Sequence, residues 1–154
     1  MSTNGYTGKG TVLSIGSALT TPTYTPVAQV KTYQFSGQAW KFEDVTNNDS
    51  TAAGPGVVEE FVPTVVSGGT MAISGVYAPD DIGRDSLAAA FAAGSLLPYK
   101  LQLPTGPGQT TTGNLFAFNA YVQDMPLPDV QFDKAMTFKC TLKIDSVITV
   151  TKGA

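Results

Sequence analysis

MTFKCTLKI, residues 136–144, is the stretch that decides the fold, because it has an apolar side chain at every even position and Thr or Lys at every odd one. Side chains of a β-strand point alternately to its two faces, so this period of two predicts a strand with one face in a core and the other in water. The same parity returns at Ile148 and Val150. A strand unbroken to Val150 would be about 50 Å long at about 3.3 Å per residue. We therefore expect a bend, bulge or turn near Ser146.

Weaker or shorter alternation recurs along the rest of the chain and predicts about seven or eight strands in all. Besides the first stretch, the expected strands are 11–15, 27–35, 38–45, 71–77, 99–103 and 116–122. One segment breaks this rhythm, because Asp85–Ala93 is rich in helix formers, begins with an acid and is followed by Gly94. The sequence therefore predicts a mainly β protein with one short helix at about Asp85–Ala93.

The composition is typical of one folded, turn-rich domain. The chain has 154 residues, of which 42% are hydrophobic, with 16 Gly and 10 Pro. We expect a single domain, 1–154, with a flexible N-terminal arm at about 1–8 and long loops at about 46–57 and 104–113, both rich in turn formers. No apolar run approaches the length of a membrane helix, and the first residues lack the pattern of a signal peptide. We expect no membrane association.

The charge and the single cysteine limit the possible partners and chemistry. The formal net charge is −3, with nine Lys and Arg against twelve Asp and Glu. Tight DNA binding depends on an excess of Lys and Arg, so it is not expected, whereas an acidic wall along which DNA slides is compatible with these numbers. Cys140 excludes an intrachain disulfide and belongs to the apolar positions of the first stretch, so we expect it in the core.

The sequence has few side chains of the kinds that enzymes use for catalysis. It contains no histidine, which removes the commonest general base and the commonest metal ligand. Asp80 and Asp81 precede the expected helix and are interpreted as caps of its N-terminus. Glu59 and Glu60 are interpreted as solvated, and the oxygen-bearing side chains of 44–49 do not have the spacing of a calcium-binding loop. We expect no enzyme, no catalytic, cofactor-binding or metal-binding residue, and no cofactor.

Several short motifs follow one another in an order that resembles a known family. They are DVTNNDS at 44–50, EEFVPT at 59–64, GGTMAI at 68–73, YAPDD at 77–81, and the closing strands at 116–122 and 135–144. In this order and spacing the chain resembles the major tail tube proteins of long non-contractile bacteriophage tails and their relatives. Asp145-Ser146 departs from that pattern, since relatives often carry a glycine there.

The resemblance implies a β-sandwich or barrel with a flanking helix, and a structural virion protein made in the bacterial cytoplasm. Six copies would close into a ring, and rings would stack into a hollow tail tube through which double-stranded DNA passes during ejection without tight binding. Further partners would be other phage tail proteins, such as the tape measure, tip and terminator. Unpaired strand edges can supply ring contacts.

Two groups of residues are candidates for these roles. We expect the loop Asn47–Gly56, together with the N-terminal arm, to reach the adjacent ring. The expected contact residues of the loop are Asn47, Asn48, Asp49, Ser50, Gly54 and Pro55. Because DNA would move past the lumen wall, we expect acids there. The candidate lumen acids are Glu43, Asp44, Asp129 and Asp133.

Other functions stay open at this stage. The chain could be an immunoglobulin-like binding or adhesion module, with Trp40, Tyr77 and Tyr121 as contact aromatics. It could also be another tail or head–tail structural protein, such as a terminator or connector, or an enzyme that uses Asp80 or Asp81 beside another acid. A surface groove of aromatics would favour the binding module, and concentration-dependent rings would favour the structural protein.

Overall fold

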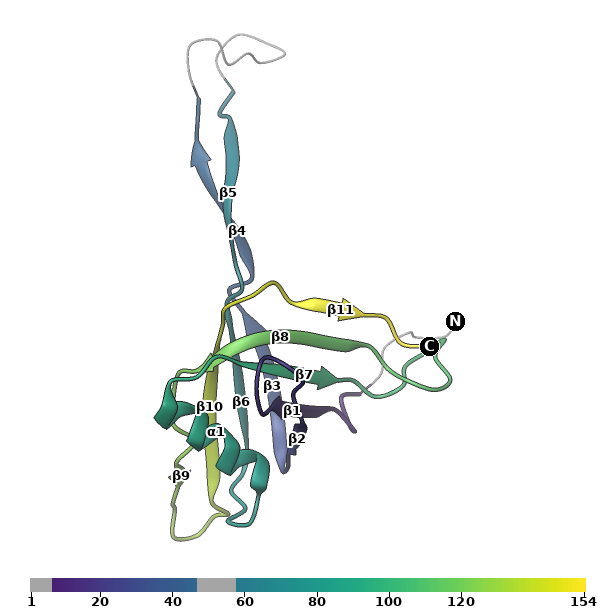
Figure 1. Cartoon of the computed structure of the whole chain (residues 1–154), viewed down its shortest axis with the longest axis vertical. Coiled ribbons are helices and arrows are strands. Elements are labelled where there is room, and N and C mark those ends of the chain that lie inside the picture. Colours follow the sequence, from purple (N-terminus) through teal and green to yellow (C-terminus); the bar gives the residue numbers. More distant parts are fainter. Residues whose placement is uncertain (1–6, 47–57) are drawn as a thin grey trace.

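The computed structural model describes residues 7–46 and 58–154, which form a curved antiparallel sheet, one helix and a long projecting hairpin (Figure 1). The helix α1 spans Ile82–Ala93. The strands are β1 (Val12–Gly16), β2 (Tyr24–Val27), β3 (Val30–Ser36), β4 (Ala39–Asp44), β5 (Phe61–Ser67), β6 (Thr70–Val76), β7 (Leu97–Gln102), β8 (Leu115–Val122), β9 (Pro128–Asp129), β10 (Thr137–Ile144) and β11 (Thr149–Thr151).

Nine of these strands form one sheet in the order β2-β1-β7-β8-β10-β6-β3, with β9 beside β10 and β11 beside β8. The register around β10 follows the sequence alternation, since Cys140 lies opposite Ile73 and Leu142 opposite Met71 on β6. The prediction of a mainly β fold with one helix is confirmed. Within the described residues the sheet stays open and does not close into a barrel.

The core lies on the concave side of the sheet. The inward side chains of β10, Phe138, Cys140, Leu142 and Ile144, are at most 4% exposed, as the alternation predicts. They pack with inward side chains of the other strands and with Leu87 of α1 in one cluster. Phe118 of β8 packs between β7 and β3. Its ring stacks on Tyr99 of β7 at 5.7 Å between centroids and meets Phe35 of β3 edge-on at 5.8 Å. The predicted core position of Cys140 is confirmed.

The helix begins three residues before the predicted Asp85. Asp81 is its N-cap, since the carboxylate accepts hydrogen bonds from Gly83 N at 3.1 Å and from Ala28 N at 3.2 Å. The capping role expected for this residue is therefore confirmed, and the second bond also ties the helix to the end of β2. Gly83 lowers helix propensity in the first turn, which hid the true start, but a side chain there would run into the Pro26 carbonyl. The helix ends at Gly94.

The break expected near Ser146 is also confirmed. β10 ends at Ile144 and β11 begins at Thr149, and the Ser146 hydroxyl accepts a hydrogen bond from Asn119 N of β8 at 2.9 Å. The predicted strand 27–35 is wrong as a continuous strand, because β2 ends at Val27, β3 begins at Val30, and Gln29 between them has a positive φ of 61°. The segment 61–67 is a strand that the alternation did not predict.

Candidate assembly surfaces

The β4–β5 hairpin is an extension of the β3–β6 pair of the main sheet. β3 continues into β4 and β5 into β6, and each pair is antiparallel. Each connection contains a glycine with positive φ. Gly37, at 78°, lies between β3 and β4, and Gly69, at 73°, lies between β5 and β6. Figure 1 shows the resulting two-stranded ribbon standing clear of the sheet. Both strands of the hairpin therefore leave the sheet through these glycine-containing connections, residues 37–38 and 68–69, which we call the joint.

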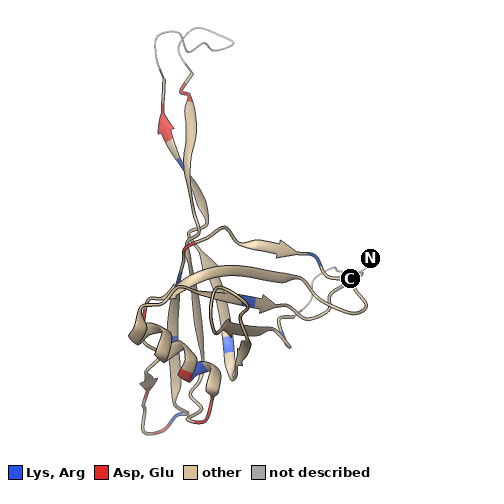
Figure 2. Ribbon diagram, viewed as in Figure 1, with Lys and Arg blue, Asp and Glu red and all other residues tan. Residues whose placement is uncertain are grey.

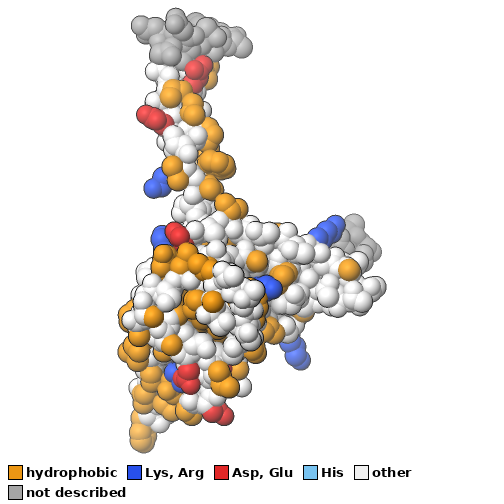
Figure 3. Space-filling view, viewed as in Figure 1, with side chains coloured by type: hydrophobic (Ala, Val, Ile, Leu, Met, Phe, Trp, Pro, Cys, Tyr) orange, Lys and Arg blue, Asp and Glu red, His pale blue; other side chains and the backbone are white. Residues whose placement is uncertain are grey.

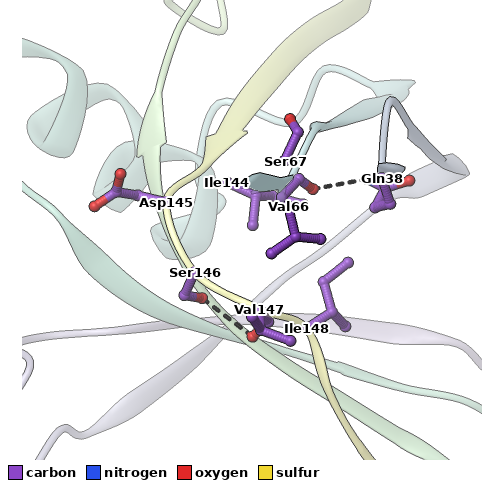
Figure 4. A pocket seen from close by; sticks show the side chains of 9 residues that line it. Gln38, Val66, Ser67, Ile144, Asp145, Ser146, Val147 and Ile148 are labelled. Carbon is purple, nitrogen blue, oxygen red and sulfur yellow. Dashed lines mark hydrogen bonds between the residues drawn. The ribbon is translucent and has the colours of Figure 1, made fainter. Parts of the chain in front are cut away.

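Two hydrogen bonds of Gln38 hold this joint. Its amide nitrogen donates to Gly68 O at 3.0 Å and to Thr70 O at 3.3 Å. A side chain on Gly69 would clash with the Ser36 carbonyl oxygen, so this glycine permits the close approach of the two strands. A hollow beside the joint lies between Gln38 and Val66 on one side and the turn Ile144–Ile148 on the other (Figure 4).

The hairpin is largely apolar and exposed along its whole length. Trp40 is 55% exposed and Phe42 is 62% exposed. The other exposed apolar residues on or beside the two strands are Val45, Val58, Phe61, Val62, Val65 and Val66. Figure 3 shows their side chains following the projecting ribbon. An isolated two-stranded ribbon is marginally stable in water, and exposed apolar patches of this kind mark interaction sites.

The two faces of the hairpin differ. Alternation along β4 places Trp40 and Phe42 on one face, and their partners in register are Val66 and Pro63. The opposite face holds Lys41 against Val65. A register shift between Lys41 and Phe42 leaves Thr64 as an extra residue, whose hydroxyl donates to Lys41 O at 3.1 Å. The hairpin therefore has an aromatic face and a mixed aliphatic and charged face.

A second apolar surface lies at the opposite end of the molecule. It belongs to the segment between β8 and β10, which contains β9 and lies at the bottom of Figure 1. Its exposed apolar residues are Met125, Leu127, Val130, Phe132 and Met136. Phe132 is fully exposed. The two ends of the long axis thus both carry apolar side chains that the described residues leave largely exposed.

The outermost strands of the sheet path leave their backbones open. In the part of the chain that the structure describes, β2 hydrogen-bonds only to β1, and β3 only to β6. Such edges can pair with a strand of another chain. They are therefore a further means of contact between copies.

The loop 104–113 is tied back to the end of the chain. The backbone N–H groups of Thr110, Thr111 and Thr112 all donate to Ala154 O, and the Asn114 carboxamide oxygen accepts from Gly153 N at 2.9 Å. The loop and Asn114 thus hold residues 153 and 154 beside the start of β8.

The predicted contact residues Asn47, Asn48, Asp49, Ser50, Gly54 and Pro55 lie outside the described residues. They belong to the segment that connects β4 to β5. The candidate lumen acids fall into two separate places. Glu43 and Asp44 end β4, whereas Asp129 and Asp133 belong to β9 and the loop after it, at the other end of the molecule (Figures 1 and 2). Whether they face a lumen stays a prediction.

The carboxylates considered for chemistry are dispersed. Asp80 is exposed. Hydrogen bonds from the Thr46 side chain and from Thr46 N, the latter at 2.9 Å, lower the pKa of Asp44. Among the described residues, no three His, Cys, Asp or Glu side chains form a group able to hold a metal ion. No described helix is long and apolar enough to span a bilayer.

The interior contains two ionisable groups that burial keeps neutral. Burial raises the pKa of the Cys140 thiol to about 12, and the thiol lies 3.3 Å from Asp124 O. Burial also raises the pKa of Tyr99, whose hydroxyl has no hydrogen-bond partner in the described part of the chain. Both side chains belong to the core cluster, so their environment is that of structural residues.

The three aromatics of the binding-module alternative do not form one groove. Tyr121 lies opposite Lys143 of β10, while Tyr77 follows β6 beyond the position opposite Thr137. Six residues of strand separate these levels, about 20 Å at about 3.3 Å per residue. Tyr77 also packs under Arg84, whose guanidinium lies 4.3 Å from the ring centroid, and Trp40 stands on the hairpin.

The signal for the hairpin was present in the sequence but differs from simple alternation. β5 reads FVPTVVS, with apolar residues on both faces and a proline, which argues against an ordinary half-buried strand. The glycines at 37 and at 68–69 bracket two apolar segments of similar length. Two apolar segments of similar length, each next to glycine, are the pattern in the sequence that could have predicted the projecting hairpin.

The chain is similar in sequence to one known protein family. A family model described as phage tail tube protein matches residues 6–150. No curated protein matches the chain.

Solved structures share the fold at low sequence identity. A chain from the tail of an empty gene transfer agent particle, refined with C6 symmetry, is 12% identical with a TM-score of 0.65, covering 96% of this chain and 99% of that one. The SPP1 tail tube protein is 11% identical with a TM-score of 0.65, over 96% and 80% of the two chains. A chain of the anti-feeding prophage tube-terminating cap is 12% identical with a TM-score of 0.63, over 99% and 95%. Tube and cap proteins therefore share this fold.

Proposed function

Since the chain belongs to the phage tail tube protein family and is a structural subunit of a tail tube, we propose that six copies close into a ring and that rings stack into a hollow tube through which DNA passes. Six copies per ring is the number that fits the C6 symmetry of the similar gene transfer agent tail. The tube would be part of the virion and would contact other tail proteins at its two ends.

The observation that carries this proposal is the exposed β4–β5 hairpin. Its aromatic face, with Trp40 and Phe42 more than half exposed, gains stability only when another surface covers it. A heterologous contact of this kind, in which a projection on one copy meets a different surface of the next, produces rings or open-ended stacks. The hairpin therefore supports assembly with further copies.

The amount of exposed surface supports the same conclusion. The chain has 9867 Å² of accessible surface, whereas a compact monomer of 16.1 kDa has about 7,400 Å². The excess is about three times the roughly 800 Å² that one partner buries in a contact of standard size. A subunit with this shape is suited to a polymer.

The segment between the two hairpin strands is the proposed contact with the adjacent ring. Asn47–Gly56 lie between β4 and β5 in the sequence, and these two strands form the projecting hairpin. Deleting Asp49–Pro55 should leave a folded monomer that no longer makes tubes. Normal tubes from the deletion variant would refute this contact.

The experiment that tests the proposal is negative-stain microscopy of the purified protein across a range of concentrations, with sedimentation velocity on the same samples. Tubes that appear as concentration rises support a tube subunit. A chain that stays monomeric at every concentration contradicts it. Single rings without tubes would instead favour a terminator, which shares the fold.

A further inference from the structure

The hollow beside the joint is a concave and largely apolar surface that is open to solvent. It has a volume of about 540 Å³ and lies between the base of the hairpin and the turn that follows β10 (Figure 4). Val66 belongs to one wall and is 42% exposed, while Val147 belongs to the other and is 69% exposed. Ile144 and Ile148 complete the apolar lining. A concave apolar surface of this size is typical of a binding site.

The hollow is continuous with the aromatic face of the hairpin. Val66 is the register partner of Trp40, so the two side chains share one face of the two-stranded ribbon. Asp145 also lines the hollow, but its carboxylate points away from Val66 and Ile148 (Figure 4). The apolar part of the hollow and the aromatic face therefore form one surface.

A side chain that fits this hollow is present on the same chain, in the turn after β9. Residues 131–134 form this turn, in which Lys134 N lies 3.5 Å from Gln131 O and Phe132 occupies the tip. Phe132 is fully exposed, and Leu127 and Val130 before it are both more than 60% exposed. An aromatic side chain can bury about 150 to 250 Å², so covering Phe132 would be strongly favourable.

The turn and the hollow lie at opposite ends of β10. β9, which precedes the turn, pairs with β10 at Thr137 and Phe138, whereas Ile144 in the hollow is the last residue of β10. Six residues of strand separate Phe138 from Ile144, about 20 Å at about 3.3 Å per residue. Phe132 therefore lies far from the hollow of its own chain, but it can meet the hollow of a copy displaced along the long axis (Figure 1).

We propose that Phe132 of one copy inserts into the hollow beside the joint of the next copy along the tube. The inference rests on the proposed function. A contact between two different surfaces of the same chain is heterologous, and when the surfaces lie at opposite ends of the long axis it repeats without limit as a stack. The hairpin projects beyond the hollow, so in this arrangement it lies beside the copy that supplies Phe132, and its aromatic face becomes covered (Figure 1).

The charges beside the two surfaces are compatible with this contact. Phe132 is followed by Asp133 and Lys134, while Lys143 and Asp145 stand on either side of the last residue of β10. Each side thus offers one acid and one base, and all four side chains are exposed. Exposed ion pairs add little to affinity, but they favour one orientation of the two surfaces. Asp133 would then belong to the contact between copies and not to the lumen wall.

The first measurement is hydroxyl-radical footprinting of the wild-type protein, as separate subunits and as tubes, with mass spectrometry as the readout. We expect Phe132 and Val147 to lose most of their reactivity when tubes form. Phe132 as reactive in tubes as in subunits would overturn the proposal. Protection of Phe132 without Val147, or of Val147 without Phe132, would also overturn it, because a different surface would then cover the protected residue.

The second measurement tests whether the two surfaces meet. Tubes of the variant Phe132→Cys/Val147→Cys are oxidised, treated with an alkylating agent and separated on denaturing gels. A disulfide requires Cα atoms within about 7 Å, so the two introduced thiols can bond only between copies, and only if the turn enters the hollow. We expect a ladder of covalent oligomers from tubes and none from separate subunits. The control variant Phe132→Cys/Leu19→Cys places the second thiol at an exposed position between β1 and β2 and should give no ladder.

Each remaining outcome decides the proposal. Variant tubes that give no ladder would overturn it, and so would a ladder that stops at dimers after complete oxidation, because a self-complementary contact links only two copies. If the variant makes no tubes, the footprint of wild-type tubes decides, since protection of both Phe132 and Val147 supports the contact and exposure of either one overturns it. Wild-type protein without tubes would instead refute the proposed function.

Discussion

Replacing Phe42 with Ser should weaken assembly without unfolding the subunit. Phe42 is 62% exposed on the aromatic face of the hairpin. An aromatic side chain offers about 200 Å² to an interface, so about 120 Å² remains to be covered, which is worth about 3 kcal/mol at about 25 cal/mol per Å². A loss of about 3 kcal/mol at that interface weakens the association by a factor of more than 100. Because the side chain is solvated in the free subunit, the monomer should lose no more than about 0.5 kcal/mol.

The assay is the concentration at which tubes first form, followed by light scattering and confirmed by microscopy. The thermal unfolding of the unassembled subunit is measured in parallel. The matched control is Val65→Ser, because Val65 is 58% exposed on the other face of the same hairpin. We expect a large rise in the threshold concentration for Phe42→Ser and a smaller one for Val65→Ser. Assembly of Phe42→Ser at the wild-type concentration would refute the role of the aromatic face.

Three further substitutions or conditions test other parts of the structure. Gly69→Ala places a methyl group against the Ser36 carbonyl at a positive φ, so it should redirect the hairpin and abolish tubes, with crystallography or cryo-microscopy as the check. Asp81→Ala should lower the free energy of unfolding by about 1 to 2 kcal/mol in urea titrations, because it removes the helix cap and the bond to Ala28 N. Cys140 should resist alkylation in the native state. Burial raises its pKa from 9.0 to about 12, so as pH rises the thiol loses its proton in the unfolded chain before it does so in the folded one. Stability should therefore fall between pH 9 and 12, by at most about 1.4 kcal/mol per pH unit from this group.

The core strands could be predicted from the sequence because burial on one face imposes a period of two. Residues 136–144 revealed β10 with all its inward side chains, and the break at Ser146 followed from strand length alone. The hairpin could not be found in this way. Both faces of β5 carry apolar side chains, so the period of two that marks a half-buried strand does not arise.

The candidate assembly surfaces show a second limit. Net charge is a sum over the chain and does not describe the charge of one face. The strand pairings bring Lys139 and Lys143 onto a sheet that carries no acid in its seven-strand path. Pairing between strands distant in sequence decides which charges share a surface, and periodicity does not reveal it.

The central claim is that six copies of this chain close into rings that stack as a tube. A cryo-microscopy reconstruction of the assembled protein, with no symmetry imposed at the first stage, tests it most directly. We predict stacked six-fold rings with the β4–β5 hairpin of each subunit covered by another copy. A reconstruction in which the hairpin stays in solvent, or in which the rings have another symmetry, would contradict the account.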